Sequence, residues 1–332
     1  SFYLSNEFSL SDKFKSILGL RAENYNLYYT GQNQQGDIIY EDENLLSELD
    51  LFPSVNLIYS LREMSNLRFS LSRTIARPSF KEKSIAQIFD PVTSTTFIGN
   101  IDILPTKILN YDLRWELFQE NAQMYAISLF YKDFTNPIEL VVYNGASPND
   151  FTPKNVEEAK VYGIELEFRK NLEFISESLS NFKLTFNTSI IRSEEIMDEK
   201  EYEGRTKSAR SGEVVSRKRE LQGQSPYLIN LGLNYNSINN NFEGSLNYNV
   251  QGKTLQIVGV NYVPDIFTEP FNSLNVNFNY KFGRTGNLKL GLGIKNLLDE
   301  KVESYYYTND IKSIYSSLSP RREFKLSLGI NF

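Results

Sequence analysis

The chain ends RREFKLSLGINF (residues 321–332), in which side chains alternate between apolar and polar or small from Phe324 onward. The apolar members are Phe324, Leu326, Leu328, Ile330 and Phe332. Successive side chains of a β-strand point to opposite faces, so a period of two indicates a strand with one apolar and one polar face. The stretch therefore predicts an amphipathic strand that continues to the last residue.

The same alternation recurs along the chain, for example in NLKLGLGIK (287–295), SLNVNFNYKF (273–282) and FEGSLNYNVQ (242–251). A tilted strand needs about 9–11 residues to cross a bilayer, and most of these segments reach that length. The pattern predicts thirteen strands near residues 2–10, 15–29, 51–62, 66–77, 106–118, 122–135, 158–170, 181–194, 226–236, 241–252, 271–282, 287–297 and 322–332.

The connections between these segments alternate in length. Five connections are short: SDKF, EMSN, QENA, SINNN and GRTGN. A sixth, NLEFISESLSN, is also short, although less clearly so. The others are long, near residues 30–50, 78–105, 136–157, 195–225, 253–270 and 298–321. Short turns on one side and long loops on the other are typical of an outer-membrane β-barrel. The alternative is a soluble all-β protein whose polar faces meet water, which the loop lengths and long strands disfavour.

Composition narrows the function further. The chain has 332 residues, a net charge of −6 and no basic block, which argues against a nucleic-acid partner. No run of 18 apolar residues is present, so we expect no transmembrane helix. Without Cys or His there is no disulfide, no thiol chemistry and no Ser-His-Asp arrangement. We therefore predict neither an enzyme nor a cofactor.

Five segments resemble motifs of TonB-dependent outer-membrane receptors, particularly the Bacteroidetes-type members. They are FSLSRTIARPSFKE (69–82), GNIDILPTKILNYDLRWEL (99–117), ISLFYKDFTNPIE with AKVYGIELEFRKNL (127–139 and 159–172), RELQGQSPYLINLGLNY (219–235) and GLGIKNLLDEKVESY (291–305). Ile101 departs from the family pattern, which usually has proline there. The segments follow in the family's order, and the resemblance spans residues 15 to 332.

The family barrel has twenty-two strands and a plugged lumen. The resemblance therefore implies that residues 1–332 are one incomplete domain, the C-terminal thirteen strands of such a transmembrane antiparallel barrel. The plug, the energy-coupling segment and the other strands would lie before Ser1 or in another chain. Phe332 resembles the terminal aromatic that the barrel-assembly machinery recognises. The other implied partners are outer-membrane lipid, the TonB energy complex acting through the plug, and a surface lipoprotein in some members; the location is the Gram-negative outer membrane.

The function implied is energised uptake of a scarce ligand, such as a siderophore, cobalamin, a glycan or a peptide. A passive porin-type channel and a structural or secretion-associated barrel are the alternatives.

Five residues are candidates for ligand contact. Arg73 and Arg77, around the end of one strand, are candidates for binding an anionic ligand, although pairing with acids of the barrel wall is the simpler explanation. Tyr305, Tyr306 and Tyr307, in the last outer loop, are candidates for stacking on sugars or aromatic siderophores, with anchoring at the membrane interface as the alternative.

Two acidic stretches, YEDENLLSELD (40–50) and EEIMDEKEYE (194–203), lack the spacing of a calcium loop, so we predict no metal site. Residues 194–220 carry many charges of both signs, which predicts a mobile or hairpin-extended outer loop.

Overall fold

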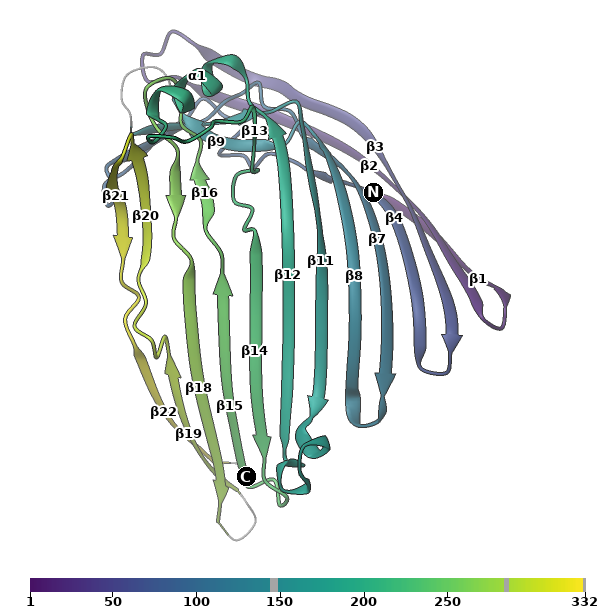
Figure 1. The fold of residues 1–332 in the computed structure, drawn as a ribbon. Coiled ribbons are helices and arrows are strands. Elements are labelled where there is room, and N and C mark those ends of the chain that lie inside the picture. Colours follow the sequence, from purple (N-terminus) through teal and green to yellow (C-terminus); the bar gives the residue numbers. More distant parts are fainter. Residues whose placement is uncertain (144–148, 284–286, 331–332) are drawn as a thin grey trace.

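A computed structural model of the chain describes residues 1–143, 149–283 and 287–330. In these residues thirteen long strands pair antiparallel in chain order to form one curved sheet (Figure 1). They are β1 (Phe2–Ser11), β2 (Phe14–Gln32), β3 (Ile39–Arg62), β4 (Ser65–Ala76), β7 (Thr106–Gln119), β8 (Gln123–Thr135), β11 (Glu158–Asn171), β12 (Phe182–Ile196), β14 (Tyr227–Asn236), β15 (Phe242–Gln251), β18 (Phe271–Phe282), β19 (Leu288–Lys295) and β22 (Glu323–Ile330). Each predicted segment overlaps one of them, which confirms the all-β fold and the meander.

The β2–β3 hairpin is longer than predicted. Residues 30–50 were expected to form a loop, but the ladder continues to the pair Gln32 and Ile39 with two register shifts. Tyr29 is buried in this extension, and its ring lies 5.8 Å from that of Tyr40 and 5.9 Å from that of Phe80. These aromatic contacts stabilise strand structure where the acidic residues alone suggested a loop.

The register gathers apolar and polar positions on opposite faces. Leu292 pairs with Phe278 and Leu326, whereas the next position, Gly291, pairs with Asn279 and Ser327. Large side chains of the apolar face are exposed along the sheet, including Leu20, Phe69, Leu113, Leu129, Leu166, Ile190, Leu231, Leu246, Phe278, Leu292 and Leu326. A continuous exposed apolar face on strands of this length suits contact with lipid.

The polar face carries an ionic network. Arg114 donates to both carboxylate oxygens of Glu167 at 3.1 and 3.0 Å, and to Glu116 at 3.2 Å. Glu116 also accepts a hydrogen bond from Arg68 at 2.5 Å. Charged side chains paired with one another across three strands are what a hydrated lumen wall requires.

The long connections contain the remaining strands and the α-helix of the described residues, whereas short 3-10 helices lie in two of the short connections. Two four-stranded sheets lie there, in the orders β5-β6-β10-β9 and β16-β17-β20-β21. Their strands are β5 (Gln87–Asp90), β6 (Thr95–Ile98), β9 (Ile138–Val142), β10 (Asp150–Asn155), β16 (Thr254–Ile257), β17 (Ile266–Thr268), β20 (Val302–Thr308) and β21 (Ile311–Leu318). A bridge between Val141 and Val258 joins the two sheets, and a small apolar core packs between them. We call these two sheets the loop body.

The connection after β12 was predicted to be mobile or a hairpin, and this prediction was wrong in part. It contains helix α1 (Glu199–Ser208) and the short strand β13 (Lys218–Arg219), which pairs with the end of β12 (Figure 1). The Asp198 side chain caps α1 by accepting a hydrogen bond from the Glu201 amide at 2.8 Å. Acids in the first turn and bases in the last complement the helix dipole.

In the part of the chain that the structure describes, no helix has the length and hydropathy needed to cross a membrane.

Candidate ligand-binding site

Arg77 lies just beyond β4 and is held by the wall of the sheet. Its guanidinium donates to Glu23 and to Asp50, each at 2.7 Å, and lies 4.6 Å from the centre of the Tyr25 ring. Its side chain is only 18% exposed. The structure therefore shows the pairing with wall acids that was the simpler explanation of this residue.

Arg73 points to the other face of the sheet. It pairs in register with Leu109 and alternates with Ser72 and Thr74, which share the polar face of β4 with Ser70. The structure therefore does not bring the two arginines together on one surface, and a ligand role for either remains a prediction.

Replacing Arg77 by glutamine should lower the free energy of unfolding by about 1–3 kcal/mol, because Glu23 and Asp50 lose their charged partner in a partly buried site. Thermal unfolding of the full-length receptor in detergent measures this effect. The matched control is Arg73→Gln on the opposite face, which should change stability little. Equal losses in both variants would contradict the pairing, and a loss of ligand affinity in Arg77→Gln at unchanged stability would instead favour a direct ligand contact.

The three tyrosines of β20 lie in the loop body. Tyr305 is 5% exposed, and its ring contacts those of Phe267 and Tyr307 at 6.3 and 5.5 Å between centres. Burial, reinforced by the nearby charge of Glu269, raises the pKa of the Tyr305 hydroxyl to about 12, so this residue stays neutral. Tyr305 acts as a packing residue in this structure.

Basic side chains lie over the aromatic rings of Phe267, Tyr305 and Tyr307. The ammonium nitrogens of Lys253 and Lys312 lie 3.8 Å from the Phe267 ring centre and 4.0 Å from the Tyr305 ring centre, respectively. Arg210 covers the half-buried Tyr307 at 4.9 Å. Tyr306, also half-buried, packs against the core between the two loop sheets. Tyr305 and Tyr307 thus both have cationic partners, and stacking on a ligand remains a prediction for all three tyrosines.

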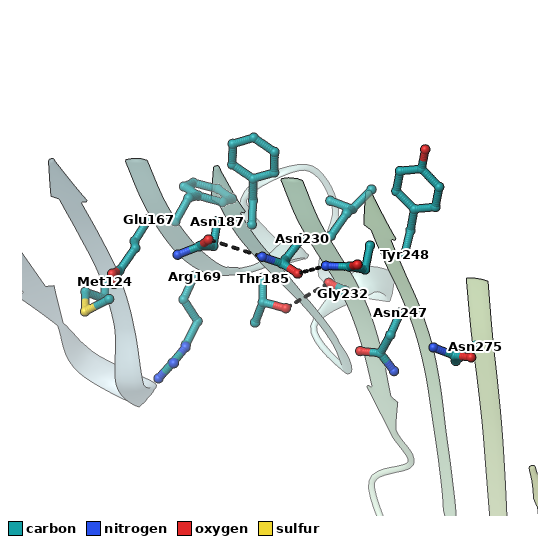
Figure 2. Close-up of a pocket in the computed structure, with 14 residues that line it drawn as sticks. Met124, Glu167, Arg169, Thr185, Asn187, Asn230, Gly232, Asn247, Tyr248 and Asn275 are labelled. Carbon is teal, nitrogen blue, oxygen red and sulfur yellow. Dashed lines mark hydrogen bonds between the residues drawn. The ribbon is translucent and has the colours of Figure 1, made fainter. Parts of the chain in front are cut away.

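A hollow of about 400 Å³ lies along the sheet below the loop body, where β11, β12, β14 and β15 run side by side. The amide of Asn230 donates to that of Asn187 on the neighbouring strand (Figure 2). It also accepts from the amide of Asn249, so the three amides form a row across three strands. On the same wall Thr185 donates to the carbonyl of Gly232 at 3.2 Å. Amides offer both donors and acceptors without charge, so this wall can bind hydroxyl-rich or peptide-like groups.

The most buried polar cluster was not found by sequence reasoning. Arg219 of β13 donates to Glu139 at 3.0 and 2.6 Å, to Glu195 at 2.8 Å and to Glu201. The four side chains are 0, 1, 1 and 6% exposed in that order. We call them the Arg219 cluster. The sequence feature that could have indicated this cluster is the motif RELQGQSPY, which begins at Arg219. The motif does not show which acidic residues pair with Arg219.

Gln222, from the same motif, strengthens this contact. Its side-chain amide accepts from the Leu140 backbone N–H at 2.6 Å and donates to the Leu140 carbonyl at 2.8 Å. It also donates to the carbonyl of Gln256 at 2.6 Å. Arg219 and Gln222 thus join the connections 136–157, 195–225 and 253–270.

The acidic stretches do not assemble an evident metal centre. In the described ranges, no group of three or more His, Cys, Asp or Glu side chains has a geometry that could hold a metal ion. The first stretch lies within β3, and the second forms the end of β12 and the start of α1.

A sheet of long antiparallel strands with an exposed apolar face, a hydrated polar face and ordered outer connections defines the barrel wall of an outer-membrane protein. A family model described as "TonB dependent receptor-like, beta-barrel" matches residues 1–297. The chain belongs to this family of outer-membrane receptors and transporters.

Solved structures share the fold. The copper transporter OprC superposes with a TM-score of 0.68 at 18% identity, covering 99% of this chain and 48% of that one. The unliganded ferric citrate transporter FecA gives 0.67 at 16% identity, with 99% and 44% covered. A mutant of the ferric enterobactin receptor PfeA from Pseudomonas aeruginosa, bound to enterobactin, gives 0.61 at 15% identity, with 99% and 45% covered.

The chain therefore spans less than half the length of these three proteins. No curated protein matches the sequence. At these identities the likeness establishes the fold, and the Bacteroidetes-type subgroup remains a prediction.

Proposed function

We propose that the chain is the C-terminal barrel portion of an energised importer, which captures a scarce ligand at its outer loops. The observation that carries this proposal is the combination, in a TonB-dependent receptor barrel, of an ordered loop body with a polar wall below it. The loop body provides a structured capture surface, and the amide-lined wall offers a hydrated route. In this proposal, a plug outside this chain blocks the lumen until the inner-membrane TonB complex acts on it.

The ligand belongs to a class that passive diffusion supplies too slowly. The structural neighbours are named for copper, ferric citrate and ferric enterobactin, which are chemically different cargoes on one fold. The fold therefore supports energised uptake as the general function. The outer connections would determine which siderophore, cobalamin, glycan or peptide is taken up.

Uptake should depend on the inner-membrane energy supply. In cells carrying the full-length receptor, collapse of the proton-motive force or loss of the TonB complex should reduce uptake to the level of a receptor deletion. Ligand binding at the cell surface should persist, because capture needs no energy. Radiolabelled candidate ligands measure both quantities in the same cells. Uptake that continues without the energy complex would replace this proposal with the passive porin-type channel.

Four further proposals follow the family resemblance. Residues 1–332 would be a single incomplete barrel domain completed by strands outside this chain. The barrel-assembly machinery and outer-membrane lipid would be its partners during biogenesis, and a surface lipoprotein would be a partner during capture. Phe332 lies outside the described residues, and its role as an assembly signal is proposed on the sequence pattern alone.

A further inference from the structure

The Arg219 cluster brings together four separate elements beyond the membrane-spanning part of the sheet. Glu139 comes from β9, Glu195 from the outer end of β12, Glu201 from α1 and Arg219 from β13. Glu195 pairs in register with Arg219, in the part of β12 beyond its last pair with β14, Ile190 and Tyr227. The cluster therefore fastens two outer connections to the barrel.

The charges of this cluster do not balance. Three carboxylates surround one guanidinium, so full ionisation would leave two uncompensated negative charges among side chains that are at most 6% exposed. The neighbouring pair of Arg205 and Asp265, whose charged atoms lie 2.6 Å apart, is neutral and supplies no compensation. In the described part of the chain, no second basic side chain forms an ion pair with the three glutamates. Uncompensated buried charge is costly enough that such groups bind protons instead.

One atom identifies where a proton would reside. The Oε2 atom of Glu195 is fully buried and has no hydrogen-bond partner, while the other oxygen accepts from Arg219. One nitrogen of Arg219 donates to Glu139 at 2.6 Å and to Glu195 at 2.8 Å, so the two carboxylates lie side by side. An ionised carboxylate can only accept hydrogen bonds, whereas a protonated one can donate. A proton on Glu195 would let this residue donate to the adjacent carboxylate and would remove one excess charge.

We propose that Glu195 and Glu139 share a proton, and that the Arg219 cluster is a pH-sensitive latch that fastens the connections 136–157 and 195–225 to the barrel. This inference concerns the outer connections themselves and does not depend on which ligand the protein takes up.

The groups that face the shared proton come from every element packed against it. Arg219 attracts the ionised form, and Glu201 opposes it from α1. Burial also raises the pKa of Glu201 above its ordinary value, with Asp265 and Glu139 adding to the rise and Arg219 opposing it. Burial is the largest cause that raises the pKa of Glu195, and the Glu139 and Glu201 carboxylates add to this rise against the single guanidinium.

The direction of the pH dependence follows from linkage. In the fastened state Glu195 retains a proton, whereas in the released state an ordinary glutamate is ionised above about pH 4.3. Release of the connections therefore releases a proton, and opening becomes more favourable as the pH rises. One proton per opening event corresponds to a rise of roughly tenfold in the opening equilibrium for each pH unit.

The test is amide hydrogen exchange of the full-length receptor in detergent, compared from about pH 6 to about pH 9 and expressed as protection factors. In the wild-type protein, protection in residues 195–225 should fall as the pH rises, while protection in the middle of β8 stays constant. The variant Glu195→Gln carries a neutral amide that can donate to Glu139, so its protection should not change with pH.

The matched control is Glu194→Gln. Glu194 is adjacent on β12 but lies on the opposite face, where it pairs with Lys218 at 2.8 Å and accepts from Tyr162 at 3.0 Å. This variant should retain the wild-type pH dependence. A wild-type protein whose protection is independent of pH overturns the proposal without any variant. A Glu195→Gln protein that is as pH-dependent as the wild type, or unprotected at every pH, also overturns it.

Discussion

Replacing Arg219 by methionine will release the outer connections from the barrel while leaving the membrane-spanning strands folded. Removal of one partner from a buried ionic cluster typically costs about 3–5 kcal/mol, because the remaining charges lose their compensation. Here three buried carboxylates would lose the guanidinium that contacts all of them, and its two bonds to Glu139 form a bidentate pair. Methionine keeps an apolar stem like that of arginine, so the loss is mainly one of charge and hydrogen bonds.

Protease cleavage within residues 195–225 of the full-length receptor measures this release. The control is Arg217→Met, two residues earlier. Arg217 forms a bidentate pair with Glu199 at 2.9 and 3.1 Å and covers Tyr202, but both charged side chains are more than half exposed. An exposed pair of this kind contributes little to stability, so the control should resist cleavage like the wild type. Equal cleavage of both variants would show that the Arg219 cluster does not hold these connections.

An arginine at Leu292 should destabilise the barrel by about 2–4 kcal/mol if this position lies near the bilayer midplane. Leu292 is the fifth of eight residues in β19 and is exposed on the apolar face beside Phe278 and Leu326. The charged side chain would have to remain in hydrocarbon or distort the strand to reach water. Chemical unfolding of the full-length receptor in lipid vesicles measures the loss.

Asn279→Arg is the matched control on the polar face. Asn279 pairs with Gly291, which neighbours Leu292 in β19 and therefore lies on the opposite face. It should be tolerated with a much smaller loss. Gly291 itself is a poorer control, since a Cβ there would lie 2.5 Å from the Ser327 hydroxyl oxygen and would add a steric cost. Equal losses for Leu292→Arg and Asn279→Arg would contradict the assignment of the two faces.

The sequence by itself determined the number, order and faces of the long strands. The period-two alternation is a local property, since consecutive side chains of a strand necessarily alternate between faces. Because a slip of one residue would move every apolar side chain to the polar face, the same pattern also specifies the register between neighbours. The alternation of short and long connections then leaves a meander as the simplest topology.

Only the tertiary structure decided how the long connections are organised. The contact between Glu139 and Arg219 joins residues 80 positions apart, and no periodic pattern in either segment predicts it. Residues 194–220 have the composition of a solvated loop, yet α1 and β13 form there, where Glu139 and Asp265 from other connections pair with their arginines. Likewise, the three adjacent tyrosines of β20 are identical in the sequence but have different surroundings. Tyr305 packs on Phe267, Tyr307 lies under Arg210, and Tyr306 packs against the loop core. In these connections stability comes from specific long-range polar and aromatic contacts, whose partners depend on where the folded strands bring the loops together.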